Sequence, residues 1–324
     1  MATTVLIADK LESAGIEGIK ALGCAVVSLP DVGAERLPQA VAEHDPRVVI
    51  VRSTKVGAPA IHAGQSLRLV VRAGAGYDTI DTKTAAARGV AVCNTPGMNA
   101  VAVAELALGM ILALDRRLVE QTDRLRAGAW DKKEFSKARG IKGQTLGLIG
   151  LGSIGREMTV RAQAFGMGVI AHSLNMTPDR AADLRVQYGG RTRDELLGML
   201  PKCDVVSVHV AANVQSERMA DGAFFAAMRP GAMFINTSRG SVVDEAALAH
   251  AVRTRGIRAG LDVYEQEPAG GTAAWKPPLA DLPGVVLAHH VGASTEQAQN
   301  AVAEETVRVV REYVLRGVFE NRVN

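Results

Sequence analysis

Residues 144–173 read QTLGLIGLGSIGREMTVRAQAFGMGVIAHS, and this stretch decides the fold class. A short apolar run, Thr145–Ile149, is followed at once by a G-x-G-x-x-G pattern that begins at Gly150. An amphipathic segment then leads to a second apolar run at Val169–Ala171. This order predicts a strand, a tight turn, a helix and a second strand, the unit from which parallel α/β sheets are built.

The glycines of this pattern have separate physical roles. Gly150 permits a sharp turn out of the strand, and Gly152 lets the backbone approach a pyrophosphate closely. The third glycine lets the helix pack against the sheet, so that free N–H groups at the helix start face the anion. Such patterns also occur in ordinary loops, but the position between a strand and a helix favours a dinucleotide site. The acidic residue expected about 20 residues further on is absent, because His172 and Ser173 stand there.

The composition argues against several classes of protein. A length of 324 residues predicts about two domains. Only 4% of the residues are aromatic and the net charge of +3 forms no basic tract, so we expect no nucleic-acid partner. Cys24, Cys93 and Cys203 lie far apart without C-x-x-C spacing, which favours reduced thiols over disulfides or a metal site.

No targeting or membrane segment is expected. The first residues, MATTVLIADK, lead directly into a strand and contain no apolar signal region. The longest apolar run, residues 100–114, is too short to span a bilayer and contains Glu105. These features predict a cytoplasmic protein.

Apolar runs and amphipathic segments alternate along most of the chain. Residues 1–95 contain five short runs rich in β-branched residues, and the alternation resumes after Ser173. It predicts an α/β fold with two doubly wound parallel sheets, the second with about six strands. Long helices at Ala100–Leu118 and Thr295–Arg316 are expected as hinges between the two parts, whereas residues 119–143 are polar and predicted to be irregular.

Two strands of the first part are followed by residues that suit an anion. Val51 precedes Arg52-Ser53-Thr54-Lys55, and Val71 precedes Arg72-Ala73-Gly74-Ala75-Gly76. Ligands of open parallel sheets bind beyond the carboxyl ends of the strands, where these groups would converge. Each arginine alone is better explained as a solvated surface charge, but the pair at strand ends, one followed by Gly-x-Gly, favours a site for a small anionic molecule.

Late strands of the second part end in residues that suit hydride transfer. Arg239 follows one strand, Asp262 and Glu267 follow the next, and His289-His290 follow the last. Oxidation of a hydroxy acid needs a base for the hydroxyl proton, and a histidine beside a carboxylate is suited to this role. An arginine binds a substrate carboxylate bidentately. A single histidine is usually structural, but three such groups at neighbouring strand ends favour catalysis.

The chain resembles the D-2-hydroxyacid dehydrogenases, most closely the branch that acts on 3-phosphoglycerate. The resemblance runs from about residue 4 to residue 318 and rests on many strings in family order: VRSTKV, VRAGAGYDTID, NTPGMNAVAVAELALGMI, WDKKEF, GQTLGLIGLGSIGRE, FINTSRGSVVDEAAL, GLDVYEQEP and HHVGAST. It implies a flavodoxin-like substrate domain of residues 1–98 and 295–324, joined by two hinge helices to a Rossmann NAD(P)-binding domain of residues 99–294.

The resemblance also implies roles for individual residues. His290 matches the catalytic acid/base, Glu267 its carboxylate partner and Arg239 the arginine that binds substrate. Gly150 and Gly152 of the glycine pattern, and Ser173 after the second strand, are expected to contact the cofactor. Further positions that match cofactor contacts in the family are Ala75, Ser153, Ile154, Val210, Thr237, Ser238, Asp262, Gly292 and Ala293. Positions that match the substrate pocket are Arg52, Ser53, Arg72, Gly74 and Gly76. Lys132 and Lys133 lie in a segment that in relatives reaches a partner subunit's active site, so a homodimer or tetramer is expected.

The chain departs from the family pattern at four places. Ser173 replaces the usual NAD-selecting aspartate, so NADP is possible beside the expected NAD, although no arginine stands beside Ser173 to favour NADP. His289 replaces a usual proline, and Val210–Asn213 lacks another. The sequence also stops after the catalytic core, so feedback inhibition through a C-terminal regulatory domain is not expected.

Three functions are consistent with this sequence. The first is oxidation of 3-phosphoglycerate by an NAD(P)-dependent D-2-hydroxyacid dehydrogenase. The second is reduction of glyoxylate or hydroxypyruvate, which needs no phosphate pocket. The third is a dinucleotide-sensing corepressor, which binds NADH and turns over slowly, although no partner-recruiting extension is apparent.

Overall fold

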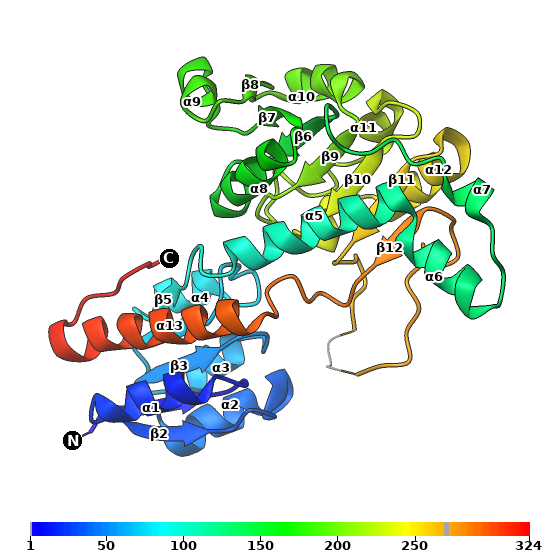
Figure 1. Cartoon of the computed structure of the whole chain (residues 1–324). Coiled ribbons are helices and arrows are strands. Elements are labelled where there is room, and N and C mark those ends of the chain that lie inside the picture. Colours follow the sequence, from blue (N-terminus) through cyan, green and yellow to red (C-terminus); the bar gives the residue numbers. More distant parts are fainter. Residues whose placement is uncertain (1, 269–271) are drawn as a thin grey trace. The chain divides into compact units, whose positions relative to one another are not determined.

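The computed structural model describes residues 2–268 and 272–324, and these form two compact units (Figure 1). Unit 1 comprises Met1–Asn99 and Ala293–Asn324, and unit 2 comprises Ala100–Gly292. Both contain one sheet in which all strands are parallel. The sequence also predicts a loop at residues 265–283, and residues 269–271 of it lie outside the described residues. Within the described parts of the chain, no helix is long and apolar enough to cross a membrane.

Unit 1 is built on a five-stranded sheet in the order β2-β1-β3-β4-β5, which is the flavodoxin-like order. Its strands are β1 (Thr4–Ile7), β2 (Ala25–Ser28), β3 (Val48–Val51), β4 (Leu69–Arg72) and β5 (Ala91–Asn94). The helices are α1 (Ser13–Ala21), α2 (Gly33–His44), α3 (Ala58–Ala63), α4 (Thr82–Ala87) and α13 (Glu296–Arg316). Because β3 is buried at every residue, its VVIV sequence packs against helices on both faces.

The two faces of this sheet have separate cores. Ile19 of α1 and Val310 of α13 belong to the core on one face. Leu37 of α2 and Ile61 of α3 belong to the core on the other. α13 therefore completes a unit whose other elements come from the first 99 residues.

Unit 2 is built on a seven-stranded sheet in the order β12-β11-β10-β9-β6-β7-β8. Its strands are β6 (Thr145–Ile149), β7 (Gly168–His172), β8 (Gln187–Tyr188), β9 (Val205–Val208), β10 (Met233–Asn236), β11 (Arg258–Leu261) and β12 (Val285–Leu287). The helices are α5 (Ala100–Arg116), α6 (Leu118–Arg126), α7 (Lys132–Phe135), α8 (Ser153–Ala164), α9 (Pro178–Asp183), α10 (Arg193–Met199), α11 (Gly222–Ala227) and α12 (Glu245–Arg255). α5 and α8 pack on one face, and α10, α11 and α12 pack on the other. This is the order of a Rossmann sheet with one added strand.

Two predictions about unit 2 were wrong. The sheet has seven strands, because the two-residue strand β8 was too short and too exposed to give a pattern. Residues 119–143 are not irregular throughout, since α6 and α7 lie there. Neither helix buries a residue within this chain, and α7 is only four residues long.

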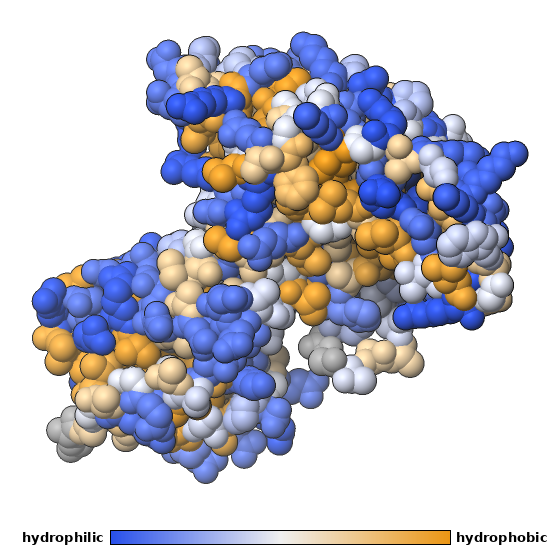
Figure 2. Space-filling model, in the orientation of Figure 1, coloured by the Kyte–Doolittle hydropathy of each residue, from blue (hydrophilic) through white to orange (hydrophobic). Residues whose placement is uncertain are grey.

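On the face shown in Figure 2, hydrophilic residues alternate with hydrophobic patches on both units. One group of exposed apolar side chains follows α5: Leu118, Val119, Leu125 and Trp130. Trp130 is 80% exposed, which is unusual for so large an apolar side chain.

Candidate functional site

The turn between β6 and α8 has the geometry of a dinucleotide cradle. Gly150 has φ +93°, and a Cβ there would lie 2.3 Å from the carbonyl oxygen of His209. A Cβ at Gly155 would lie 2.2 Å from the carbonyl oxygen of Gly150, so no larger residue fits at either position. A Cβ at Gly152 would meet nothing within 4 Å. The open space lies where the second glycine admits a pyrophosphate, so these residues fit a dinucleotide.

The first turn of α8 adds free donors to this cradle. Gly152 is the N-cap of α8 and provides no side-chain hydrogen bond to the helix. Ser153 and Ile154 begin the helix, and the N–H groups of a helix's first turn have no partner within the helix. With the positive end of the helix dipole, they suit a phosphate.

A buried polar group supports the turn from the neighbouring strand. His209 follows β9, and its Nε2 lies 2.8 Å from Ser207 Oγ. Burial lowers the pKa of His209 to about 4. Its Nδ1 lies 3.5 Å from Oγ1 of the predicted cofactor residue Thr237. His209 is therefore neutral at physiological pH, and its backbone carbonyl forms the floor under Gly150.

The end of β7 contains no carboxylate at the ribose position. Burial lowers the pKa of His172, whose Nδ1 lies 3.3 Å from the carbonyl oxygen of Gly189. Ser173 donates its backbone N–H to the carbonyl oxygen of Gly190 at 3.3 Å. One cation near this loop was not found from the sequence: Arg180 donates from Nη2 to the carbonyl oxygen of Leu151 at 3.3 Å.

His290 and Glu267 form a hydrogen-bonded pair. His290 Nδ1 lies 2.7 Å from Glu267 Oε2, and Tyr264 donates its N–H to Glu267 Oε1 at 2.8 Å. Burial alone would raise the pKa of Glu267, but the bonds from His290 and Tyr264 and the charges of His290 and Arg239 outweigh it and lower that pKa. An ionised carboxylate only accepts, so Nδ1 of His290 carries the proton and Nε2 is left for a substrate.

The third predicted catalytic residue, Arg239, is held by the turn after β10. Asn236 donates from Nδ2 to the carbonyl oxygen of Arg239 at 2.9 Å and accepts from Ser238 N–H and Oγ at 3.0 and 2.7 Å. Gly240 lies so close to the next strand end that a Cβ there would be 1.9 Å from the carbonyl carbon of Tyr264. Arg239 and the loop of Glu267 are thereby brought near one another.

Asp262 fixes the backbone beside His290. Its carboxylate accepts from the N–H groups of Val291 and Gly292, both at 2.8 Å. Burial raises the pKa of Asp262 despite these bonds. His290 itself has φ +54°, a left-handed conformation that is uncommon for a residue with a side chain. The predicted cofactor residues Asp262 and Gly292 thus also hold the histidine loop.

In unit 1, Asp9 organises the loop that contains Arg52 and Ser53. Asp9 Oδ2 accepts from the N–H groups of Arg52, Ser53 and Thr54 at 2.6, 3.0 and 2.9 Å. Its Oδ1 accepts from the hydroxyls of Ser53 and Thr54 at 3.1 and 3.0 Å. β1 and β3 are neighbours at the point where the strand order reverses, so this is the ligand-binding edge of the sheet. Asp9 could not be identified from the sequence, because it acts on the backbone of a distant segment.

The second predicted substrate loop depends on a glycine. Gly74 has φ +147°, and a Cβ there would lie 1.4 Å from Arg72 Nη1, so a larger residue would strain the backbone and displace that guanidinium. Arg72 also donates from Nη1 to the carbonyl oxygen of Ala73 at 3.4 Å. Asn94 donates from Nδ2 to the carbonyl oxygen of Ala75 at 2.6 Å, which fixes the backbone just before Gly76.

The structure brings together some of the predicted residues. Four of them lie at strand ends of unit 2: Arg239, Asp262, Glu267 and His290. The cradle residues, Thr237 and Ser238 also follow strands of this sheet. Val210 lies after β9 and is half-buried. Arg52, Ser53, Arg72, Gly74, Ala75, Gly76 and Ala293 belong to unit 1. Lys132 and Lys133 are exposed on α7, and a role towards a partner subunit stays a prediction.

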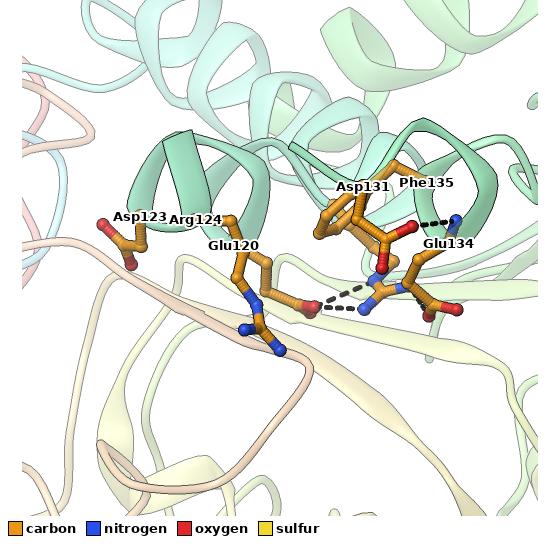
Figure 3. Close-up of a pocket in the computed structure, with 7 residues that line it drawn as sticks. Glu120, Asp123, Arg124, Asp131, Glu134 and Phe135 are labelled. Atoms are coloured by element: carbon orange, nitrogen blue, oxygen red, sulfur yellow. Dashed lines mark hydrogen bonds and ion pairs between the residues drawn. The ribbon is translucent and has the colours of Figure 1, made fainter. Parts of the chain in front are cut away.

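A charged pocket lies elsewhere in unit 2, between α6 and α7 (Figure 3). Arg117 binds Glu120 and Glu134 at 2.6 and 2.7 Å, and its guanidinium stacks 4.7 Å above the ring centre of Phe135. Arg117 is therefore already paired within this pocket, whose lining carries four carboxylates and two guanidinium groups. Over residues 2–268 and 272–324, no cluster of three or more His, Cys, Asp or Glu side chains is arranged to hold a metal ion.

Comparison with known proteins agrees with this geometry. Residues 108–292 match the family model described as D-isomer specific 2-hydroxyacid dehydrogenase, NAD binding domain. The chain belongs to the D-isomer specific 2-hydroxyacid dehydrogenase family. Its members are oxidoreductases that act on 2-hydroxy acids.

Three members of the family illustrate the similarity. A D-3-phosphoglycerate dehydrogenase of Mycobacterium leprae is 38% identical over 97% of this chain and 57% of its own length. A hydroxypyruvate reductase of Thermotoga maritima is 40% identical over 81% of this chain and 83% of its own. The crystal structure of an NADPH-dependent glyoxylate/hydroxypyruvate reductase of Sinorhizobium meliloti, in complex with NADP and malonate, has a TM-score of 0.85 at 29% identity, covering 100% of this chain and 97% of that one. The chain thus spans a little over half the length of the phosphoglycerate dehydrogenase.

Proposed function

We propose that this chain is an NAD(P)-dependent D-2-hydroxyacid dehydrogenase with His290 as its acid/base. The observation that carries the proposal is the 2.7 Å bond between His290 Nδ1 and Glu267, an acid whose pKa is lowered. The bond orients the imidazole and leaves Nε2 to exchange a proton with the substrate oxygen.

Three side chains act on the substrate in different ways. Arg239 binds the carboxylate of the 2-hydroxy acid and stabilises the carbonyl dipole that develops during oxidation. His290 takes the hydroxyl proton, and Glu267 stabilises the imidazolium that results. A bound nicotinamide supplies the hydride acceptor. Its dinucleotide would be held by Gly150, Gly152, Ser153 and Ile154 at the cradle, with the other predicted cofactor residues around it.

The first-choice substrate is D-3-phosphoglycerate, oxidised to 3-phosphohydroxypyruvate. Arg52 and Arg72 at the edge of unit 1 suit a second anionic group, and the sequence is similar to curated phosphoglycerate dehydrogenases. With this substrate the protein would act in serine biosynthesis. We further propose a cytoplasmic location and a homodimer or tetramer.

One observation favours the second candidate, a glyoxylate or hydroxypyruvate reductase. The three N–H groups of Arg52, Ser53 and Thr54 would form a phosphate nest, but Asp9 accepts all three. A substrate phosphate would therefore depend on side chains alone. The similarity to the Thermotoga hydroxypyruvate reductase supports the same alternative.

Steady-state kinetics test both candidates. D-3-phosphoglycerate oxidation is measured beside reduction of phosphohydroxypyruvate, hydroxypyruvate and glyoxylate, each with NAD(H) and NADP(H). Preference for the phosphorylated pair supports the dehydrogenase of 3-phosphoglycerate, whereas turnover of glyoxylate with inert phosphorylated compounds supports the reductase. His290→Ala should lose at least about 10²-fold in kcat while still binding dinucleotide. Near-wild-type turnover in this variant would refute the assigned chemistry.

A further inference from the structure

The adenosine end of the dinucleotide site contains a cation that bridges two loops. Arg180, on α9, donates from Nη2 to the carbonyl oxygen of Leu151, the second residue of the glycine turn, at 3.3 Å. It donates from Nη1 to the carbonyl oxygen of Asn175, two residues beyond Ser173, at 3.3 Å. The guanidinium therefore lies between the turn after β6 and the loop after β7.

This is the place of the adenosine ribose in a dinucleotide-binding sheet. An acidic residue at the end of the second strand binds the 2′-hydroxyl of NAD, whereas a nearby arginine accommodates the 2′-phosphate of NADP. Ser173 occupies the position after β7. Its hydroxyl makes no hydrogen bond within the described part of the chain, so it is available as a donor to a ligand.

Arg180 retains both charge and donors for such a ligand. Two carbonyl oxygens use two of its five N–H groups. Over the described ranges it forms no ion pair, so its charge is not neutralised by a neighbouring carboxylate. A carboxylate at position 173 would repel a phosphate, and the serine does not.

We propose that Ser173 and Arg180 bind the 2′-phosphate of NADP(H), and that this chain therefore prefers NADP(H) to NAD(H). The proposal rests on the dinucleotide-dependent function proposed above. The sequence alone led to an expectation of NAD with NADP possible, because no arginine stands beside Ser173 to favour NADP. The arginine comes instead from α9, seven residues further along the chain.

Calorimetric binding of two nucleotides to the full chain tests this without any turnover. The probes are 2′,5′-ADP, which carries the 2′-phosphate, and 5′-ADP, which lacks it. We expect the wild type to bind 2′,5′-ADP at least about ten-fold more tightly, since charge-assisted bonds contribute this much or more. Arg180→Gln should reduce the ratio to about two-fold or less. Ser173→Asp should reverse the preference, because its carboxylate repels the phosphate and accepts from a 2′-hydroxyl.

The controls separate a charge effect from a loss of structure. Arg253→Gln removes an exposed positive charge from α12 of the same unit and should leave the ratio unchanged. If Arg180 only held the two loops together, Arg180→Gln would weaken both nucleotides equally, and that result overturns the proposal. Ser173→Asp leaves Arg180 in place, so it provides a second test if Arg180→Gln does not fold.

The remaining outcomes distinguish this proposal from the proposed function. Equal binding of the two nucleotides by the wild type, or tighter binding of 5′-ADP, overturns the NADP(H) assignment and leaves the dehydrogenase function standing. If neither nucleotide binds, the dinucleotide-dependent function fails, and the assignment fails with it.

Discussion

Glu267 is the residue on which the proposed proton transfer depends most directly. Its pKa is lowered, so the paired state with His290 is fully present above pH about 4.5 and is lost as pH falls through the folded-state value. We expect Glu267→Gln to lower kcat by about 10²–10³-fold, because a neutral amide does not stabilise the imidazolium. The pH profile of kcat/KM should shift as well.

A matched variant lies in the same loop. Glu265 pairs with Arg218 on the surface at 2.8 Å, and Glu265→Gln should change kcat by less than about three-fold. Equal losses of kcat in the two variants would show that the negative charge of the loop matters, and not the specific pairing of Glu267 with His290.

His209 should make the protein less stable in mild acid. Its pKa is lowered from 6.5 to about 4 by burial, so between these values the unfolded chain binds a proton that the folded chain does not. Stability is therefore complete above pH about 6.5 and falls with pH by up to about 1.4 kcal/mol per unit until about pH 4. His172, whose pKa is also lowered by burial, acts in the same direction.

Chemical denaturation of His209→Gln at pH 7 and pH 5 measures this effect. The variant should lose up to about 2 kcal/mol less than the wild type over that interval, whatever its stability at pH 7. His250→Gln, at an exposed position on α12, should behave like the wild type. An unchanged pH dependence in His209→Gln would show that other groups cause the acid sensitivity.

At the residue scale, the sequence revealed groups that carry charge at strand ends but not those that act on the backbone. Arg239, Glu267 and His290 follow predictable strands, and the structure pairs the last two. Asp9, Asn236 and Gly240 act through contacts with the main chain of other segments, and nothing in their local sequence shows those contacts. Arg180 was missed for the same reason, because its acceptors lie on two different loops.

The loop after β3 is an element whose shape depends on one carboxylate. Asp9→Asn replaces an acceptor of three N–H groups with an amide that cannot satisfy all of them. Charge-assisted bonds contribute about 1.5–3 kcal/mol each, so the loop of Arg52 should lose its order. We expect KM for the preferred oxo acid to rise about ten-fold or more, with kcat within about three-fold of the wild type.

A control carboxylate of similar bonding exists in the same unit. Asp45 accepts from Ser66 N–H at 2.8 Å and from Ser66 Oγ at 2.7 Å, away from the strand ends at issue. Asp45→Asn should reduce stability without changing KM. A large fall in kcat for Asp9→Asn, with KM unaltered, would contradict a positioning role in substrate binding.

At the scale of elements, burial decided what could be predicted. The strands other than β8 were predicted from short apolar runs, such as VVIV in the buried strand β3. α6 buries none of its residues, its apolar Leu118, Val119 and Leu125 being exposed, and β8 has only two residues, both exposed.

The whole molecule consists of two units, one of them assembled from separate parts of the chain. Val310 of α13 is fully buried in the same core as Ile7 and Ile50. Val310→Ala should cost about 2 kcal/mol and loosen the part of the molecule to which it belongs. Hydrogen exchange should speed up in residues 2–99 and stay unchanged in residues 100–268.

Val206→Ala gives the matched comparison. Val206 is fully buried in a core of unit 2, so the same change of side chain should speed up exchange there and leave residues 2–99 unaffected. If either variant loosened both units to the same extent, their cores would not be independent.

Unit 1 is formed by two segments that are far apart in the sequence, so its parts are synthesised at different times. All of unit 2 is translated before α13, an interval of roughly 10–40 s at roughly 5–20 residues per second. Until then the face of the first sheet that α13 covers is exposed to water, while the residues of unit 2 are already complete. We therefore expect the middle of the chain to complete its fold before the beginning does, because the core shared with α13 cannot close until that helix is made.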